Sequence, residues 1–401
     1  MELQRKLTLI DLVMVGIGSI IGSGIFILFA SILSRSKQFI FWAFLLAAIP
    51  NILCALAYAE IASMFQQNDA EYDSIREALG EPTAKATIYV LLCFIIFNTA
   101  TILLFIGHLL DFQYVKLFLC GLLLILSIIN YYGITVSKGI INTVGVIEIS
   151  ILILIALLSS PNWKIKNITT LPPITNNSFL FASFMSLFLY SGYDAIIKMS
   201  EETIFPKYDV SYGLIGSVVT VTIIYLLLGL TASSSNNLPS IYNSKTPITG
   251  LFSEFINKDS AFMITALGLI ILMNTLFISM LSLSRFIYSL SKEHLLPSYL
   301  NKLDETHKTP YNAIITVFII LTVIALIFTG EKCAMFTNLF FLTFTIFLMI
   351  SVIILRIYRP DMERPFMIPL SIENIPIPMI VGILLSIFYL FIGICNYHEA
   401  Q

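Results

Sequence analysis

The residues that stand out for their chemistry form a run of small side chains in the middle of the first apolar segment. Between Gly16 and Gly24, nine positions hold four glycines and two serines. Glycine costs a helix about 1 kcal/mol relative to alanine, so the run predicts a helix that unwinds near 20–24. Open backbone inside a membrane is tolerated only where protein buries it or it lines a cavity. The second half-helix then presents free N–H groups to an anion such as a carboxylate.

A competing interpretation of the same run is a helix-packing face, because Gly18-x-x-x-Gly22 fits the small-xxx-small pattern. A second group of small residues favours the first interpretation. Ser191 and Gly192 interrupt the apolar segment 179–198, and the acid Asp194 follows them. Interrupted segments at matching positions in two halves of a chain are the sequence pointer to a midplane binding site in transporters.

Single polar residues inside other apolar segments are further candidates. Glu148 is an ionisable residue within an apolar span, which indicates either a functional group or a helix-pairing residue with a buried partner. Asn98 in segment 86–110 can bond a neighbouring helix or face a ligand. In segment 260–290, Asn274, Thr275 and nearby serines can bind a cation or bond their own helix carbonyls.

The elements that position these residues are apolar helices. Of 401 residues, 58% are hydrophobic and 11% are charged, with a mean hydropathy of +0.92, whereas soluble domains carry about 25% charged residues. This composition predicts an all-α polytopic membrane protein and lacks the alternation of a membrane β-barrel. We expect about eleven membrane segments, at 7–33, 40–65, 86–110, 115–132, 138–160, 179–198, 213–235, 260–290, 311–329, 333–356 and 373–395.

Charge and cysteine placement exclude several classes of protein. The net charge of −2 gives no nucleic-acid footprint, and the five cysteines show neither metal spacing nor a disulfide framework. Neither a metal nor a cofactor is expected. Fourteen lysines and arginines fall in connections on the same side of the membrane as the N-terminus, and eight fall in connections on the opposite side. Because cytoplasmic connections carry the excess of lysine and arginine, this distribution predicts a cytoplasmic N-terminus. Glu60 is then expected near the cytoplasmic end of segment 40–65, where it need not be buried.

Taken in order, several stretches resemble the signatures of the amino acid–polyamine–organocation transporters, over about residues 5 to 395. They are Gly16-x-Gly18-x-x-x-Gly22-Ser23-Gly24-Ile25-Phe26, Ala57-Tyr58-Ala59-Glu60, Glu71-Tyr72 with Arg76-Glu77-Ala78, Tyr190-Ser191-Gly192-Tyr193-Asp194, Glu201-Glu202, Ser284-Arg285 through Pro297, Lys308-Thr309-Pro310 and Arg364-Pro365-Phe366. The resemblance implies a leucine-transporter-like fold of two inverted five-helix repeats, 7–160 and 179–356, with an extra helix at 373–395, in one transmembrane domain.

The resemblance also implies the substrate site. The α-carboxylate of an amino acid is expected on the amides around Ser23 and Gly24. The α-amino group is expected near the carbonyls of Ile20, Phe188, Leu189 and Ser191, and Phe188 occupies the position of an aromatic lid. The implied substrate-binding set is Ile20, Gly22, Ser23, Gly24, Phe188, Leu189, Tyr190, Ser191 and Gly192. Asp194, Glu148 and Tyr193 are the expected coupling or gating residues.

The chain departs from this family in two respects. Many members have twelve spans, and a twelfth is not evident here. Many proton-coupled members carry a lysine in the fifth segment, where this chain has Glu148. We expect a multi-pass transporter of a bacterial-type cytoplasmic membrane that moves an amino acid, a neutral one being favoured, by proton symport or by exchange for a counter-substrate. The alternatives are an amino acid sensor without net transport, a membrane-embedded enzyme, whose motifs are not evident, and a channel. The oligomeric state is left open.

Overall fold

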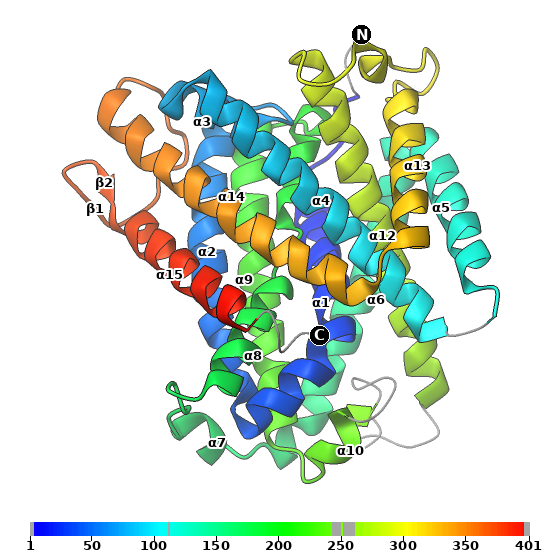
Figure 1. The fold of residues 1–401 in the computed structure, drawn as a ribbon, viewed down its shortest axis with the longest axis vertical. Helices are drawn as coiled ribbons and strands as arrows, with labels where there is room; N and C mark the ends of the chain where they lie inside the picture. Colours follow the sequence, from blue (N-terminus) through cyan, green and yellow to red (C-terminus); the bar gives the residue numbers. More distant parts are fainter. Residues whose placement is uncertain (1–3, 111–112, 243–249, 252–260, 397–401) are drawn as a thin grey trace.

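A computed structural model describes residues 4–110, 113–242, 250–251 and 261–396. Long helices dominate it (Figure 1). Their bounds, with short 3₁₀ helices written η, are α1 Leu9–Ser36, η1 Lys37–Phe39, α2 Ile40–Met64, α3 Ala70–Leu79, α4 Glu81–Leu110, α5 Val115–Tyr131, α6 Ile134–Ser159, η2 Ser160–Asn162, α7 Lys166–Thr169, α8 Asn177–Phe188, η3 Tyr193–Glu202, α9 Pro206–Ser233, α10 Leu238–Tyr242, α12 Ala261–Lys292, η5 Ser298–Asn301, α13 Tyr311–Ile327, α14 Gly330–Tyr358 and α15 Ile377–Cys395. One small hairpin pairs strands β1 Ser371–Ile372 and β2 Ile375–Pro376.

The helices confirm an all-α polytopic membrane fold. In the described residues, eight helical stretches are long and apolar enough to cross a membrane, and three shorter apolar helices accompany them. Each of the eleven predicted segments coincides with a helical element. Large apolar side chains are exposed on the outer helices, for example Ile327 of α13 at 70% and Phe391 of α15 at 68%. Such side chains are expected to face lipid. The two inverted repeats and their boundaries remain predictions.

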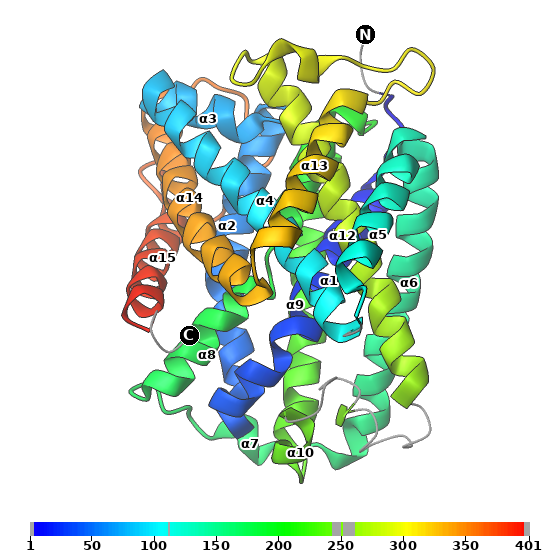
Figure 2. The same cartoon turned by 45° about the vertical axis from the view of Figure 1, so that its right-hand side comes forward.

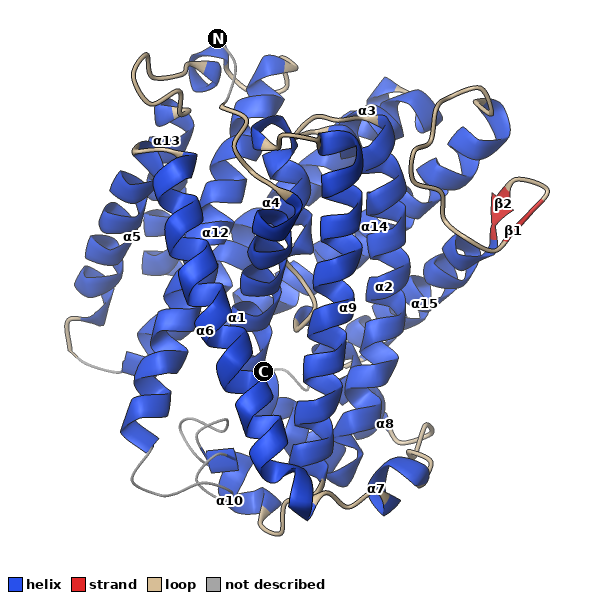
Figure 3. Ribbon diagram, turned by 180° about the vertical axis from the view of Figure 1, so that it is seen from behind, coloured by secondary structure: helices blue, strands red, loops and turns tan. Residues whose placement is uncertain are grey.

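Helix α1 lies in the interior of the bundle, with α6, α8, α9 and α12 packed around it (Figure 2). Seen from behind, α6 and α9 run alongside it (Figure 3). The start of α1 is set by Thr8, whose backbone N–H and hydroxyl both donate to the Asp11 carboxylate, at 2.8 and 2.7 Å. The helices packed against α1 include α6 from the first half of the chain and α9 and α12 from the second half.

The predicted unwinding of α1 near 20–24 is wrong, because α1 is a continuous α-helix from Leu9 to Ser36. The glycines serve close helix packing instead. The Thr275 hydroxyl of α12 donates to the Gly18 carbonyl at 2.6 Å. A Cβ added at Gly22 would collide with the Thr275 side chain and would lie 3.2 Å from the Ile271 carbonyl oxygen. The small-residue packing face, the competing interpretation, accounts for this stretch.

The predicted interruption in segment 179–198 is confirmed. Helix α8 ends at Phe188, and the chain resumes as the 3₁₀ helix η3 at Tyr193. Gly192 has φ of +110°, a value that side chains rarely adopt, and an added Cβ would lie 2.9 Å from the Ser19 carbonyl oxygen of α1. Only glycine therefore fits this break, and the break lies directly against the small-residue run of α1.

The beginning of the chain is tied to the end of η3. The backbone N–H groups of Lys6 and Leu7 both donate to the Glu202 carbonyl, at 2.8 and 2.9 Å. The Ile204 N–H returns a hydrogen bond to the Leu7 carbonyl at 2.9 Å, which makes a parallel bridge between Leu7 and Thr203. Helix α3 lies at one end of the bundle, opposite α7 and α10 (Figure 1).

Candidate functional site

Two backbone carbonyls predicted to bind the substrate amino group converge on one side chain. The Tyr225 hydroxyl of α9 lies 3.1 Å from the Leu189 carbonyl oxygen in the break and 3.3 Å from the Ile20 carbonyl oxygen of α1. Tyr225 is fully buried. The candidate residues of the first apolar segment and those of segment 179–198 thus meet at this hydroxyl. Sequence reasoning did not select Tyr225, because a lone tyrosine in an apolar segment does not reveal which backbone it faces.

Other residues of the break have partners within the bundle. The Ser191 hydroxyl donates to the Phe188 carbonyl at 2.8 Å and lies 3.4 Å from Oδ1 of Asn98 on α4. The Tyr190 hydroxyl donates to the Phe44 carbonyl of α2 at 3.2 Å, and Phe188 is fully buried. From the sequence, Asn98 could either bond a neighbouring helix or face a ligand. In the structure its side chain lies at the break.

Gly22, Ser23 and Gly24 lie within the helical part of α1. Gly22 faces Thr275. The side-chain position of Ser23 and the environment of Gly24 lie outside the described residues, so the predicted carboxylate site on these amides stays a prediction. A continuous helix offers fewer free N–H groups than a broken one, because interior amides already bond the carbonyl four residues earlier.

Of the coupling candidates, Tyr193 and Asp194 lie at the start of η3 and Glu148 lies on α6. Tyr193 stacks edge-on against Tyr58 of α2 at a centroid distance of 5.7 Å. Asp194, one residue on, is 5% exposed. Glu148 of α6 is fully buried and faces Gly18 of α1, one helical turn before Gly22.

Beyond Asp194, buried ion pairs fasten η3 to its neighbours. Lys198 contacts Glu71 of α3 at 2.5 Å with both side chains fully buried, and its ammonium lies 4.0 Å from the Phe286 ring centroid. Arg285 of α12 donates to both oxygens of Glu202 at 3.2 Å. These pairs hold η3 against α3 and α12.

The expectation that Glu60 need not be buried is wrong. Glu60 is 1% exposed, and it bonds Arg356 of α14 and accepts from the Ile368 N–H at 2.9 Å. Its partner lies 296 residues later in the chain, so no local pattern could have shown that the charge is paired.

A buried acid in the connection between α2 and α3, Asp69, makes stability depend on pH. Burial, with the nearby charges of Asp73 and Glu293, raises the pKa of Asp69 to about 7. The unfolded chain has an ordinary aspartate pKa near 3.9. Between about pH 4 and 7 the folded state therefore holds the extra proton, and stability falls as pH rises through this window.

We expect Asp69→Asn to make stability less dependent on pH. At pH values above 7, the melting temperature of this variant should be higher than that of the wild type. The measurement is thermal unfolding of the purified protein between pH 4.5 and 8, with the exposed Asp361→Asn as the control. Parallel curves for wild type and Asp69→Asn would contradict the assignment.

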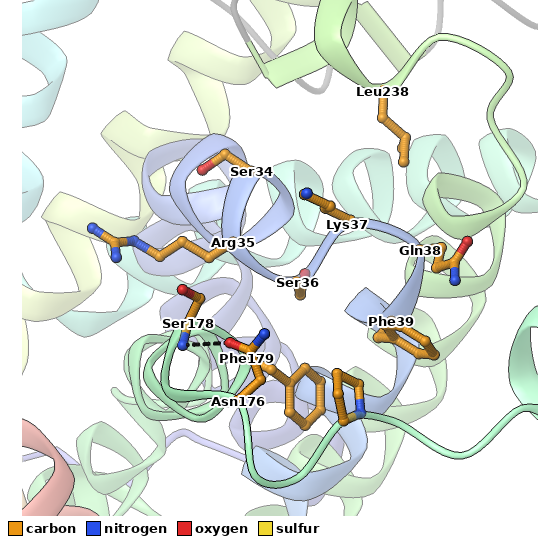
Figure 4. Close-up of a pocket in the computed structure, with 11 residues that line it drawn as sticks. Ser34, Arg35, Ser36, Lys37, Gln38, Phe39, Asn176, Ser178, Phe179 and Leu238 are labelled. Atoms are coloured by element: carbon orange, nitrogen blue, oxygen red, sulfur yellow. Dashed lines mark hydrogen bonds between the residues drawn. The ribbon is translucent and has the colours of Figure 1, made fainter.

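A separate cavity of about 520 Å³ lies at the α7 end of the bundle. It is lined by Ser34, Arg35, Ser36, Lys37, Gln38, Phe39, Pro173, Asn176, Ser178, Phe179 and Leu238 (Figure 4). None of these residues belongs to the predicted substrate set. Among the residues that the structure describes, no group of three His, Cys, Asp or Glu side chains is placed to hold a metal ion.

Comparison with known proteins identifies the family to which the sequence is similar. A family model described as "Amino acid permease" matches residues 7–399. The branched-chain amino acid permease BcaP of Bacillus subtilis is 24% identical, over 98% of this chain and 88% of that protein. The methylthioribose transporter of the same organism is 23% identical, over 98% and 90%. Cationic amino acid transporter 1 of Arabidopsis thaliana is 24% identical, over 82% of this chain and 59% of that protein.

Proposed function

Because the chain belongs to the amino acid permease family, a family of multi-pass membrane transporters, we propose that it carries a neutral amino acid across the cytoplasmic membrane by alternating access. The N-terminus faces the cytoplasm in this proposal. The substrate lies where the α8–η3 break meets α1. Interrupted helices of transporters supply backbone groups to a substrate near the bilayer midplane, and in this proposal the α8–η3 break has that role beside the continuous helix α1.

The observation that carries the proposal is the convergence of the Leu189 and Ile20 carbonyls at the Tyr225 hydroxyl. Two carbonyl oxygens from elements distant in the chain are suitable acceptors for a substrate ammonium. In the present state Tyr225 supplies the hydrogen that an amino group would supply. The substrate carboxylate is assigned to the amides of Gly22, Ser23 and Gly24, and Phe188 is assigned the covering role.

Two features support a neutral side chain. Aromatic residues dominate the surroundings of the break, with Phe188, Tyr190 and Tyr193 all at most 1% exposed. Asp194, the acid of η3 nearest to the break, already has the Lys198 ammonium of the same helix as a neighbouring positive charge. The relatives include both a branched-chain permease and cationic amino acid transporters.

Transport in this proposal is coupled to proton entry or to exchange of a counter-substrate, with Asp194, Tyr193 and Glu148 as the residues concerned. Uptake into proteoliposomes separates a transporter from an amino acid sensor. Accumulation of labelled amino acid inside vesicles supports transport, whereas binding without accumulation supports the sensor.

The first test is thermal stability of the purified protein against a panel of amino acids. At 100 times its dissociation constant, a ligand of the folded state stabilises by about 2.7 kcal/mol. We expect neutral amino acids to raise the melting temperature of the wild type. We expect no effect on Gly24→Leu, which places a side chain at the proposed carboxylate site. A panel in which only cationic amino acids, or none, stabilise the wild type would overturn the substrate class.

A further inference from the structure

Two buried arginines near the end of α14 share a single carboxylate. Arg356 bonds Glu60 through Nε, at 2.8 Å, and through Nη2, whereas Nε of Arg364 lies 3.6 Å from the same carboxylate. The three side chains are at most 6% exposed. Two positive charges and one negative charge are therefore buried together, and a buried charge without a counter-charge is costly. Burial lowers the pKa of the Arg364 guanidinium below its ordinary value, although Glu60 opposes this shift.

The other acids of this region do not supply the missing negative charge. Glu77 of α3 pairs with Arg359, and Glu363 pairs with Lys207 of α9 at 2.6 Å. Asp361 is exposed, so solvent and salt screen its charge. Within the described part of the chain, neither buried arginine forms an ion pair with a second acid. The cluster thus carries an excess positive charge.

Each of the two arginines also keeps one N–H group that its contacts leave unused. An arginine side chain has five N–H groups. Those of Arg356 make four hydrogen bonds, to Glu60, to the Ser371 hydroxyl and to the Ile368 carbonyl. Those of Arg364 make four bonds to backbone carbonyls of α14 and the loop after it, and in the described structure its Nε has no partner. Two donors therefore accompany the excess charge.

A cavity of about 160 Å³ lies beside both arginines. It is lined by Arg356, Pro360, Met362, Arg364, Met367 and Asn374, and none of these described residues is acidic. Guanidinium groups suit phosphate in particular, because their N–H groups match the spacing of its oxygens. The cavity therefore offers positive charge and hydrogen-bond donors to a phosphate group.

The surroundings of this cavity are apolar and lie at the side of the bundle. Met367, which lines the cavity, is more than half exposed. So are Leu370 and Ile372, the neighbours of the Ser371 that bonds Arg356. The hairpin β1–β2 projects from the edge of the bundle next to α15 (Figure 1, Figure 3). Buried cations beside exposed apolar side chains match the two parts of a phospholipid, its headgroup and its acyl chains.

We propose that this cavity binds the phosphate group of an anionic phospholipid, with Arg356 and Arg364 facing the phosphate and Leu370 and Ile372 facing the acyl chains. The lipid supplies the negative charge that the cluster around Glu60 lacks, and it fastens the end of α14 to the hairpin. A zwitterionic lipid binds less well, because its ammonium group brings a like charge to the arginines. The inference goes beyond the proposed function and does not depend on the substrate.

The test is native mass spectrometry and thermal unfolding of the full-length protein after removal of lipid in detergent. The probes are dioleoyl phosphatidylglycerol, dioleoyl phosphatidylcholine, which has the same acyl chains without net charge, and inorganic phosphate. The main variant is Met367→Glu, which places a carboxylate at the cavity in place of the lipid anion. Met367→Gln is the matched control, with the same shape and no charge. Arg364→Gln, which removes the excess charge, is a second variant.

We expect a single phosphatidylglycerol to bind each chain about tenfold more tightly than phosphatidylcholine and to raise the melting temperature. Met367→Glu should lose this preference and, without lipid, should melt at a higher temperature than Met367→Gln, because it carries its own counter-charge. Met367→Gln should keep the preference. Arg364→Gln, if it folds, should lose it.

Equal binding of the two lipids, or an unchanged preference in Met367→Glu, would refute the site. Stabilisation by inorganic phosphate as strong as that by phosphatidylglycerol would assign the cavity to a free anion and overturn the lipid. A mass of two chains without bound lipid would assign the apolar surface to self-association and overturn it as well. Failure of the amino acid panel would refute only the proposed substrate, since no amino acid enters these measurements.

Discussion

Replacement of Gly192 by alanine is expected to abolish transport and to lower the melting temperature. An alanine at φ of +110° is strained by about 1–2 kcal/mol. Its Cβ would also lie 2.7 Å from Oγ and 2.9 Å from the carbonyl oxygen of Ser19, and overpacking adds about 1–3 kcal/mol. Since one of these atoms is backbone, α1 itself must move away from the break where the substrate is proposed to lie.

The measurements are uptake by proteoliposomes and thermal unfolding, with Gly121→Ala as the matched control. Gly121 lies within α5, and an added Cβ would meet no atom within 4 Å. Alanine there should keep activity and gain up to about 1 kcal/mol from helix propensity. If Gly192→Ala matched wild type in both measurements, the close contact between the break and α1 would be refuted.

Removal of the Glu60 carboxylate is expected to have the largest effect on stability. Glu60 lies 2.8 Å from Nε of Arg356, and Arg364 lies 3.6 Å away. Glu60→Gln leaves both guanidinium groups without an anion at a site where all three side chains are at most 6% exposed. Breaking a buried pair from one side costs about 3–5 kcal/mol, so the yield of folded protein and its melting temperature should both fall.

A double variant distinguishes the lost pair from a merely altered shape. Glu60→Gln combined with Arg356→Met removes both partners, and we expect it to recover part of the stability lost in Glu60→Gln alone. Glu81→Gln, which removes an exposed pair with Lys85, should leave the melting temperature unchanged. Strictly additive effects of the two substitutions would mean that Glu60 and Arg356 do not interact.

The sequence was sufficient for the membrane segments, because a helix that faces lipid must be apolar over about 20 residues and hydropathy measures this directly. The break at Ser191-Gly192 was also predictable, since glycine followed by an acid within an apolar segment has few structural explanations. The membrane segments and the break both depend on residues that are adjacent along the chain.

The continuity of α1 could not be predicted from the same kind of pattern. A run of glycines permits both an unwound helix and a close helix contact, and Thr275 decides between them from more than 250 residues away. Tyr225 and the Glu60–Arg356 pair were missed for the same reason. Their roles come from partners on helices distant in sequence, and one sequence does not show which helices meet.

The hydrogen bonds between Lys6, Leu7 and the end of η3 have a consequence for how the protein is made. The first residues of the chain cannot reach their final contacts until Glu202 to Ile204 have left the ribosome. At about 5–20 residues per second, roughly 200 residues take about 10–40 s to synthesise. During that interval α1 enters the membrane without its N-terminal attachment and without α9 and α12. The small-residue face of α1 is then exposed to lipid or to the insertion machinery, and completion of η3 is the event that fixes the first helix in place.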